Sequence, residues 1–214
     1  MRRIIVMLIA FLGLAVLPSA GAEAAGTGSE AGVSTRDKIE IGVTFTDKWA
    51  KISNTTGTRF AMPGGAVDVF FSLGNKVKHL GIAAEVQGET ATQNIWLGAG
   101  LSQITFVAGP RYYLWEERQK EGSRRRSAKV YCEALVGGMH AFNSLFTSGG
   151  KTTSSANSFA LQAGGGMDLP LPFVNTRKVG FRLVEADFIL TKLPNVHNGT
   201  QGDFRASTGL TFHF

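Results

Sequence analysis

Apolar and polar residues alternate with a period of two over most of the chain from Lys38 onward. An apolar residue at every second position is typical of a β-strand that has one apolar face. In 38–47, for example, Ile39, Ile41 and Val43 share one side, and the residues between them are polar or small. Seven segments keep a single phase, and they predict strands at 38–47, 65–73, 79–89, 101–115, 129–142, 158–171 and 202–214.

An eighth segment, 179–193, breaks the alternation. Glu185 and Asp187 share the parity of the apolar residues that precede them, so a regular strand would place both acids on the apolar face. A β-bulge near Val184 would reset the phase and turn these acids to the same side as Arg182. The alternative is that both acids lie beyond the apolar layer of a membrane. We expect the bulge.

The segments are long, and their polar faces are unusual. Most reach the ~9–11 residues that a tilted strand needs to cross the hydrocarbon of a membrane, whereas strands of soluble proteins commonly run to about 5–6 residues. The polar faces hold mostly Gly, Ala, Ser and Thr with few charges, which suits a narrow barrel interior. A soluble β-sandwich is the alternative. The prediction is an all-β fold, an eight-stranded antiparallel up-and-down transmembrane β-barrel.

The first residues resemble an export signal rather than part of a fold. A basic start, Met1-Arg2-Arg3, precedes an apolar stretch without charge at 4–17, which is followed by small residues. These are the parts of a secretory signal peptide; an uncleaved anchor would need about 20 apolar residues. We expect a signal peptide at 1–22, a flexible periplasmic tail at 23–37 and the barrel domain at 38–214.

If the tail lies in the periplasm, the connections between strands should alternate between short inner turns and long outer loops. Long outer loops are then expected at 48–64, 90–100, 143–157 and 194–201, and inner turns at 74–78, 116–128 and 172–178. The turn 116–128 carries a run of basic residues, but no aromatic or groove-entering context that would indicate a nucleic-acid site. A solvated turn that touches anionic headgroups is the simpler interpretation.

Aromatic residues lie near both expected boundaries between water and lipid. Tyr112, Tyr113 and Trp115 lie toward one rim, and Trp49 and Phe142 toward the other. Such girdles are usual in membrane barrels, although scattered core aromatics would give a similar pattern.

Composition changes this picture little. The 27 glycines suit a crowded barrel interior. The formal charge of +6 falls to about +4 once Arg2 and Arg3 leave with the signal peptide. A lone Cys132 excludes an internal disulfide or a cysteine-based metal site.

The charges on the polar faces are the candidate site. Because an unpaired ion in the lumen would cost several kcal/mol, we expect them to pair. The expected network consists of Glu85, Arg111, Glu133, Arg182, Glu185, Asp187 and Arg205. It would either fill the barrel as a plug or line a path for small solutes and ions. Eight strands leave an interior just wide enough for side chains, which favours the plug.

The end of the chain, Gly209-Leu210-Thr211-Phe212-His213-Phe214, resembles the C-terminal signal of outer-membrane barrels. The resemblance implies that Leu210, Phe212 and Phe214 form an assembly signal that the barrel-assembly machinery reads. With the leader and the eight segments, the chain resembles the small OmpA/OmpX-like barrel domains over 38–214. This implies a protein of the bacterial outer membrane, surrounded by outer-membrane lipid, and does not identify an extracellular partner.

Some barrels of this shape are enzymes, so the histidines need attention. Lipid A deacylases of this shape use a His and a Ser two positions apart on a strand, and none of the four histidines, His79, His140, His197 and His213, has a serine at that spacing. No His or Asp cluster has the spacing of metal ligands. We therefore expect no catalytic residue, metal or cofactor. The expected function is a structural or surface-interaction role with a side-chain-filled lumen; the alternatives are a narrow porin-like channel for small polar solutes and a lipid-acting enzyme.

Overall fold

The computed structural model describes residues 39–51, 59–74, 77, 79–91, 100–116, 128–148, 151–171, 178–194 and 200–214. The predicted signal peptide and tail, 1–22 and 23–37, lie outside the described residues. The strands are β1 (Ile39–Lys51), β2 (Arg59–Ser72), β3 (Leu80–Thr90), β4 (Ser102–Glu116), β5 (Lys129–Ser148), β6 (Lys151–Pro170), β7 (Val179–Thr191) and β8 (Gln201–His213). No helix among the residues described is long and apolar enough to span a membrane.

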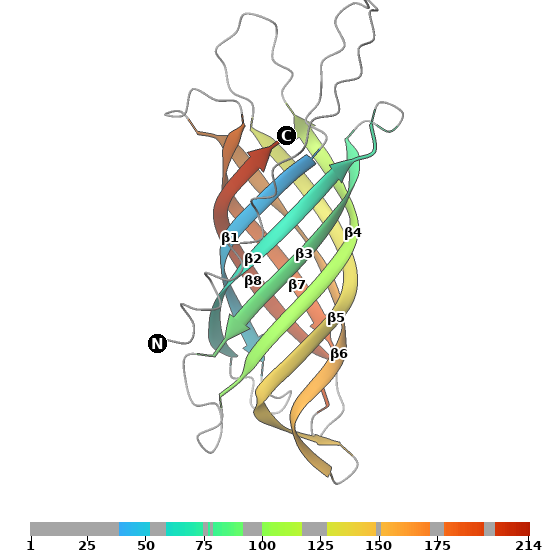
Figure 1. Ribbon diagram of the computed structural model, residues 1–214, viewed down its shortest axis with the longest axis vertical. Coiled ribbons are helices and arrows are strands. Elements are labelled where there is room, and N and C mark those ends of the chain that lie inside the picture. Colours follow the sequence, from blue (N-terminus) through green and yellow to red (C-terminus); the bar gives the residue numbers. More distant parts are fainter. Residues whose placement is uncertain are drawn as a thin grey trace, which may run out of the picture. The chain divides into compact units, whose positions relative to one another are not determined.

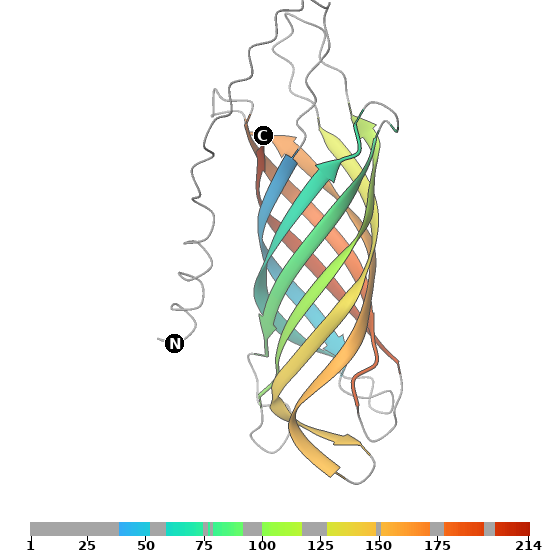
Figure 2. The same ribbon diagram turned by 45° about the vertical axis from the view of Figure 1, so that its right-hand side comes forward.

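Each strand pairs antiparallel with its neighbours in sequence, and β1 also pairs with β8, so the sheet closes on itself (Figures 1 and 2). The seam ends at Ile39 and Phe214. The Ile39 amide donates to the Phe214 carbonyl over 3.2 Å, and the Phe214 amide donates to the Ile39 carbonyl over 2.9 Å. The predicted fold, a closed antiparallel barrel of eight strands, is confirmed. We call the end of the barrel that holds Ile39 and Phe214 the proximal end, and the other the distal end.

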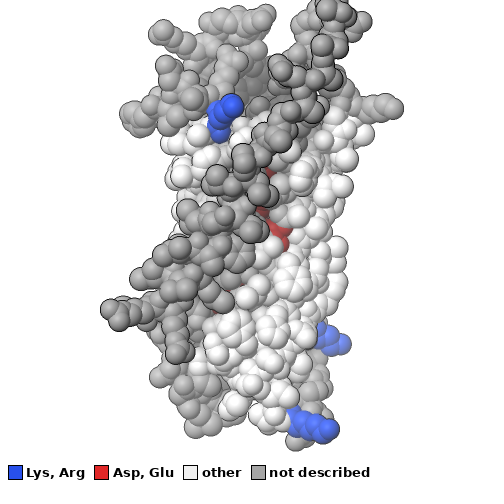
Figure 3. Space-filling view, viewed as in Figure 1, with Lys and Arg blue, Asp and Glu red and all other residues white. Residues whose placement is uncertain are grey.

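The two faces of the wall differ in chemistry, as the alternation predicts. Large apolar side chains point outward, and Phe45, for example, is 60% exposed. Its neighbours Thr44 and Thr46 point inward and are buried. Most of the wall that is not covered by grey atoms in Figure 3 is white, without charged side chains. An apolar exterior around a polar interior is typical of a barrel in a bilayer.

The irregular strand β7 contains the bulge that its sequence predicts. Its pairing with β8 shifts between Arg182 and Glu185, and the two residues between them, Leu183 and Val184, are both exposed. The extra outward residue resets the alternation. Arg182, Glu185 and Asp187 consequently all point inward and are buried.

Two expected outer loops are strand over much of their length. β1 and β2 pair as far as Lys51 and Arg59, so the loop expected at 48–64 is wrong at both ends. β5 and β6 pair as far as Ser148 and Lys151, so the loop expected at 143–157 is also wrong. Beyond the apolar layer a strand needs no apolar face, because water solvates both sides. The backbone ladder therefore continues where the hydrophobic alternation has stopped.

Tyr113 does not belong to an outer girdle, contrary to expectation. Tyr112 points outward and is exposed, whereas Tyr113 points inward and is buried. A register shift between Tyr113 and Trp115 then leaves both Leu114 and Trp115 exposed. The prediction grouped adjacent aromatics by position along the axis, although neighbours in a strand face opposite sides.

Candidate functional site

All seven charged residues expected in the lumen point into it and are buried. They come from five strands: Glu85 from β3, Arg111 from β4, Glu133 from β5, Arg182, Glu185 and Asp187 from β7, and Arg205 from β8. The three arginines are among the largest side chains that are fully enclosed.

Arg205 binds carboxylates that lie on both sides of the lumen. Its Nη2 donates to Glu185 Oε1 over 2.8 Å, and its Nε donates to Asp187 Oδ2 over 3.0 Å. Its guanidinium also donates to both oxygens of Glu85 on β3. Because β3 and β8 are not neighbours in the sheet, the contact with Glu85 crosses the interior of the barrel. Charge-assisted bonds of this kind are stronger than bonds between neutral groups.

Two glutamines extend the Arg205 cluster around the wall. Arg205 Nη1 donates to Gln87 Oε1 over 2.9 Å. The Gln87 amide donates to Gln162 Oε1, and the Gln162 amide donates to Glu85 Oε2, each over 2.9 Å. Both amides therefore donate and accept, which links β3, β6 and β8 in one network, and the Gln162 amide also donates to Glu133 Oε1 over 3.5 Å.

Arg182 occupies the neighbouring part of the lumen, toward the proximal end. Its Nε donates to Asp168 Oδ1 over 3.0 Å, and its Nη1 donates to Asp68 Oδ1 over 2.7 Å. The same Nη1 lies 2.7 Å from Glu185 Oε2. Since Glu185 also binds Arg205, it joins the clusters around the two arginines. Asp68 lies on β2, so this cluster also crosses the interior.

Arg111 completes the network and shares Asp68 with Arg182. Its Nε donates to Glu133 Oε2 over 2.7 Å, and its Nη1 donates to Asp68 Oδ2 over 3.0 Å. Asp68 Oδ1 therefore accepts from Arg182, and Asp68 Oδ2 accepts from both Arg111 and Arg182. This carboxylate bridges β4 and β7 across the lumen.

An aromatic group lies between the two proximal arginines. The Tyr131 ring centroid is 4.4 Å from Arg111 Cζ and 5.2 Å from Arg182 Cζ, within the range of cation–π attraction. The Tyr131 hydroxyl donates to Glu185 Oε2. Tyr113 packs edge-on against Tyr131 at 5.9 Å, and Phe70 against Tyr113 at 5.2 Å. These rings fill the space that the charged groups leave.

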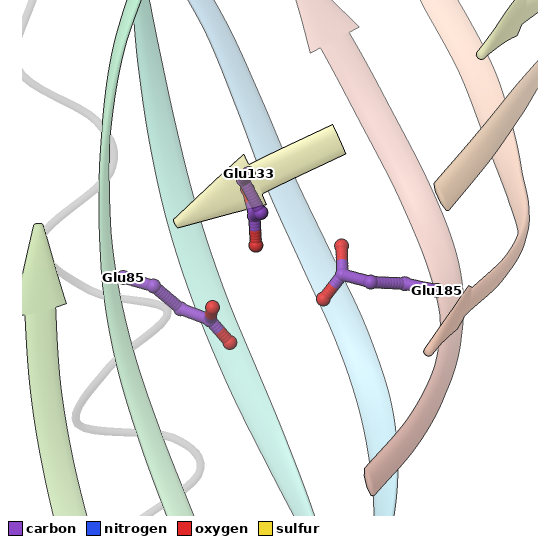
Figure 4. A group of neighbouring side chains, drawn as sticks. All are labelled: Glu85, Glu133 and Glu185. Atoms are coloured by element: carbon purple, nitrogen blue, oxygen red, sulfur yellow. The ribbon is translucent and has the colours of Figure 1, made fainter. Parts of the chain in front are cut away.

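Glu85, Glu133 and Glu185 converge from three strands, with carboxylate oxygens that lie within 4.8 Å of one another (Figure 4). Three clustered carboxylates could hold a cation. Here every one of the six oxygens already accepts a hydrogen bond, from Arg111, Arg182, Arg205, Gln162, Tyr131 or Ser207. The group is therefore the acceptor side of the arginine network and does not resemble a metal centre.

Smaller ion pairs lie near each end. At the distal end, Lys48 Nζ lies 2.8 Å from Glu89 Oε2 and also donates to Gln103. At the proximal end, Glu40 accepts from the Tyr113 hydroxyl over 3.1 Å and lies 3.6 Å from Lys129 Nζ. Buried polar side chains therefore lie near both ends of the lumen as well as around the three arginines.

Acids outnumber bases inside the barrel. The buried cations among the described residues are Lys48, Arg111, Arg182 and Arg205. The nine buried carboxylates are Glu40, Asp68, Glu85, Glu89, Glu133, Asp168, Glu185, Asp187 and Asp203. Most carboxylates must therefore share a cation, as the contacts of Arg182 and Arg205 illustrate. Among the described residues, the lumen therefore holds more carboxyl groups than basic side chains.

Inward-facing glycines provide the space for these long side chains. A Cβ atom on Gly42 would lie 2.0 Å from Asp68 Oδ1, and one on Gly164 would lie 2.1 Å from Asp187 Oδ1. Real Cβ atoms do not approach other atoms so closely. These two positions therefore need glycine because a neighbouring carboxylate occupies the place of the side chain.

Several members of the network were not among the expected site residues. Asp68, Asp168 and Gln162 lie on the polar side of the predicted strands, so the alternation places them inward without revealing their partners. The alternation also places Tyr131 on the inward face of its strand. An aromatic residue at that position, however, did not suggest contacts with charged groups. Lys48 and Glu89 lie close to or within expected loops, and the greater length of the strands brings them into the lumen.

The residues of the expected assembly signal all point outward at the end of the chain. Leu210 and Phe214 are exposed, and Phe212 is partly exposed. This leaves their role in assembly as a prediction. Two of the histidines have partners other than serine: His140 Nδ1 lies 2.7 Å from Asn157 Oδ1, and His213 Nδ1 lies 3.1 Å from Glu40 Oε2.

No known protein family matches the sequence, and no curated protein is similar to it at a significant level. Among solved structures, the chain is similar to Ail, the attachment invasion locus protein of Yersinia pestis, with 13% identity, a TM-score of 0.39, and coverage of 81% of this chain and 96% of Ail. It is also similar to the N-terminal β-barrel domain of Pseudomonas aeruginosa OprF, with 12% identity, a TM-score of 0.41, and coverage of 82% and 97%. At these values the similarity carries no argument about function.

Proposed function

We propose that this chain is an outer-membrane β-barrel of a Gram-negative bacterium, with a lumen closed by its own side chains and a non-enzymatic role in envelope structure or surface interaction. The outward side chains support the membrane location. Exposed large apolar residues on the wall include Val43, Phe45, Phe71, Phe106, Phe159, Phe188, Phe204 and Leu210. A soluble monomer rarely exposes apolar patches of more than a few hundred Å².

The main support for a closed lumen is that ion pairs cross it from one side of the barrel to the other. Arg205 on β8 binds Glu85 on β3, and Arg182 on β7 binds Asp68 on β2. A channel would keep its charged side chains along the wall, whereas these reach toward the opposite side. The diameter of eight strands leaves little room beside them.

Opening this lumen would be costly. To let a solute pass, Arg205 would have to leave carboxylates that have few other cations within reach. Breaking one buried pair commonly costs about 3–5 kcal/mol when the remaining charge is unpaired. We therefore expect the network to remain closed at equilibrium.

We base the proposed direction of insertion on the expectation that the tail at 23–37 is periplasmic. The proximal end holds Ile39, which follows the expected periplasmic tail, so this end would face the periplasm. The distal end, with the long β5–β6 hairpin, would then face outward. A surface-interaction role would depend on this hairpin and the neighbouring distal loops.

Planar-bilayer recording of the refolded chain tests the closed lumen. The expected result is a bilayer without discrete, reproducible conductance steps. The alternative function, a narrow channel for small polar solutes, is favoured by one observation, the excess of acids in the lumen. It predicts steps with cation selectivity, and such steps would refute the plug.

Two further experiments address the rest of the proposal. A folded barrel should migrate differently on unboiled and boiled gels, and a chain that stays soluble without detergent would contradict the membrane location. Incubation with lipid A and phospholipid should leave both unchanged, whereas a modified lipid would indicate an enzyme.

A further inference from the structure

The β5–β6 hairpin contains an irregularity just beyond the point where β5 leaves the rest of the barrel. Phe142 pairs with Ser155, and the next paired position is Phe146 with Thr153. Three residues of β5 therefore stand opposite one residue of β6. Asn143, the first of them, has a φ of 61°, in the left-handed region that asparagine tolerates better than most residues. Bulges bend the strands that contain them.

Two adjacent residues that follow Asn143 differ in burial. Leu145 is 57% exposed, whereas Phe146 is only 7% exposed, as expected for neighbours that point to opposite sides of a strand. Phe146 belongs to a cluster of buried apolar side chains that includes Ala141, Ala160 and Leu193 and extends along the lumen to Tyr113 and Phe70. In Figures 1 and 2 the hairpin, drawn in yellow and orange, turns at the distal end instead of continuing along the wall.

The cluster around Phe146 lies beside the distal ion pair. Ala141 of β5 is in register with Gln103 of β4, and Gln103 accepts from Lys48, which also binds Glu89. Lys48 is fully buried near the distal end of β1. A lysine so close to the end of a barrel would be solvated unless something covered it, because a buried charge is unfavourable without exclusion of water by its surroundings.

We propose that Phe146 is the lid residue of the distal mouth, held over it by the Asn143 bulge and packed in a cluster with Leu193. The lid separates the charge network from the outer water with an apolar layer. The proposal rests on the proposed function, since it concerns the closure of the same lumen, and it adds a second, independent seal to the crossing ion pairs. The lid is a packing contact rather than an ion pair, so it can open without disturbing Arg205 or Arg182.

Accessibility of a buried thiol tests the lid directly. In a background in which Cys132→Ala removes the native thiol, Ala141→Cys places a probe within the buried cluster that contains Phe146. The refolded protein in nanodiscs is exposed to a charged, membrane-impermeant thiol reagent, and the labelling rate is measured. Phe146→Gly should raise this rate at least about tenfold, which corresponds to about 1.4 kcal/mol of lost closure.

The matched control is Leu145→Gly, which removes an exposed leucine from the same bulge and should leave the rate unchanged. If Phe146→Gly does not fold, as judged by heat-dependent migration on gels, Leu193→Ser opens the cluster from its other side and should raise labelling in the same way. Equal rates in the parent and in folded Phe146→Gly or Leu193→Ser would overturn the lid, and so would an equal increase in Leu145→Gly.

Thiol labelling and ion conductance distinguish the failure of the proposed lid from the failure of the proposed plug. If the parent conducts ions in a planar bilayer, the proposed plug fails, whatever the labelling shows. If the parent does not conduct but Phe146→Gly leaves labelling unchanged, the plug stands and the lid fails. The two proposals therefore have different readouts on the same protein.

Discussion

Replacing Arg205 by methionine removes the cation that Glu85, Glu185 and Asp187 share. Methionine fills much of the arginine volume, so the change acts mainly on charge and hydrogen bonding. Glu185 keeps a bond to Arg182, but the contacts of Glu85 and Asp187 with a cation are lost. Removing one partner of a buried pair typically costs about 3–5 kcal/mol, and we expect a loss of folding free energy in this range.

Urea unfolding of the refolded barrel, followed by tryptophan fluorescence, measures this loss. For a slope of about 2 kcal/mol per molar urea, 3–5 kcal/mol shifts the midpoint down by roughly 1.5–2.5 M. Arg59→Met is the matched control, because Arg59 is exposed at the start of β2, and its midpoint should move by less than about 0.5 M.

Two further variants distinguish the effect of the Arg205 charge from the effect of the guanidinium geometry. Arg205→Lys keeps the charge but has one nitrogen in place of the fork that reaches three carboxylates, so it should recover only part of the loss. Adding Glu85→Gln and Asp187→Asn to Arg205→Met removes the stranded charges and should also recover stability. The reasoning would be refuted if Arg205→Met and Arg59→Met had the same midpoint, or if the neutralised triple variant were no more stable than Arg205→Met.

Other substitutions test space, hydrogen bonding and assembly. Gly42→Ala should destabilise the barrel by about 1–3 kcal/mol in urea unfolding because the new methyl group collides with Asp68, whereas Gly88→Ala, with no atom within 4 Å of its Cβ position, should be close to neutral. Tyr131→Phe leaves a buried carboxylate one donor short and should cost about 1–3 kcal/mol in the same assay. Phe214→Ala should reduce insertion into the outer membrane in cells, measured by membrane fractionation, while refolding into detergent stays nearly normal; equal loss in both would contradict a role in recognition by the assembly machinery.

The sequence predicts the faces of this barrel well because the alternation is imposed by two different solvents. In the proposed membrane location, lipid outside and a crowded polar lumen inside leave each strand one possible phase, and a one-residue slip would exchange the two faces. The bulge in β7 could be predicted for the same reason. Glu185 and Asp187 would otherwise have faced outward, and the extra residue near Val184 returns them to the lumen.

The partners inside the lumen could not be predicted in the same way. Alternation fixes that Arg205 and Glu85 both point inward, but the tilt and stagger of the strands decide at which height each one lies. Asp68 was therefore placed on the correct face, without any indication that it bridges Arg111 and Arg182. Strand ends were missed for a different reason. Polar hairpin segments such as 151–157 carry no hydrophobic signal, although their backbones remain paired.

The two seals of the lumen differ in the free energy needed to open them. Swinging Phe146 out exposes one aromatic side chain, and full burial of such a side chain contributes about 1.5–3 kcal/mol. Separating Arg205 from its carboxylates strands buried charge and costs about 3–5 kcal/mol. The lid should therefore open more often than the network. A thiol at Ala141 would then react faster than one placed deeper, for example at Ala83, which is buried and faces Phe70 across the β2–β3 pair. The reverse order would mean that water reaches the interior from the proximal end, past Tyr113 and Lys129, and that the ion pairs rather than the lid limit access.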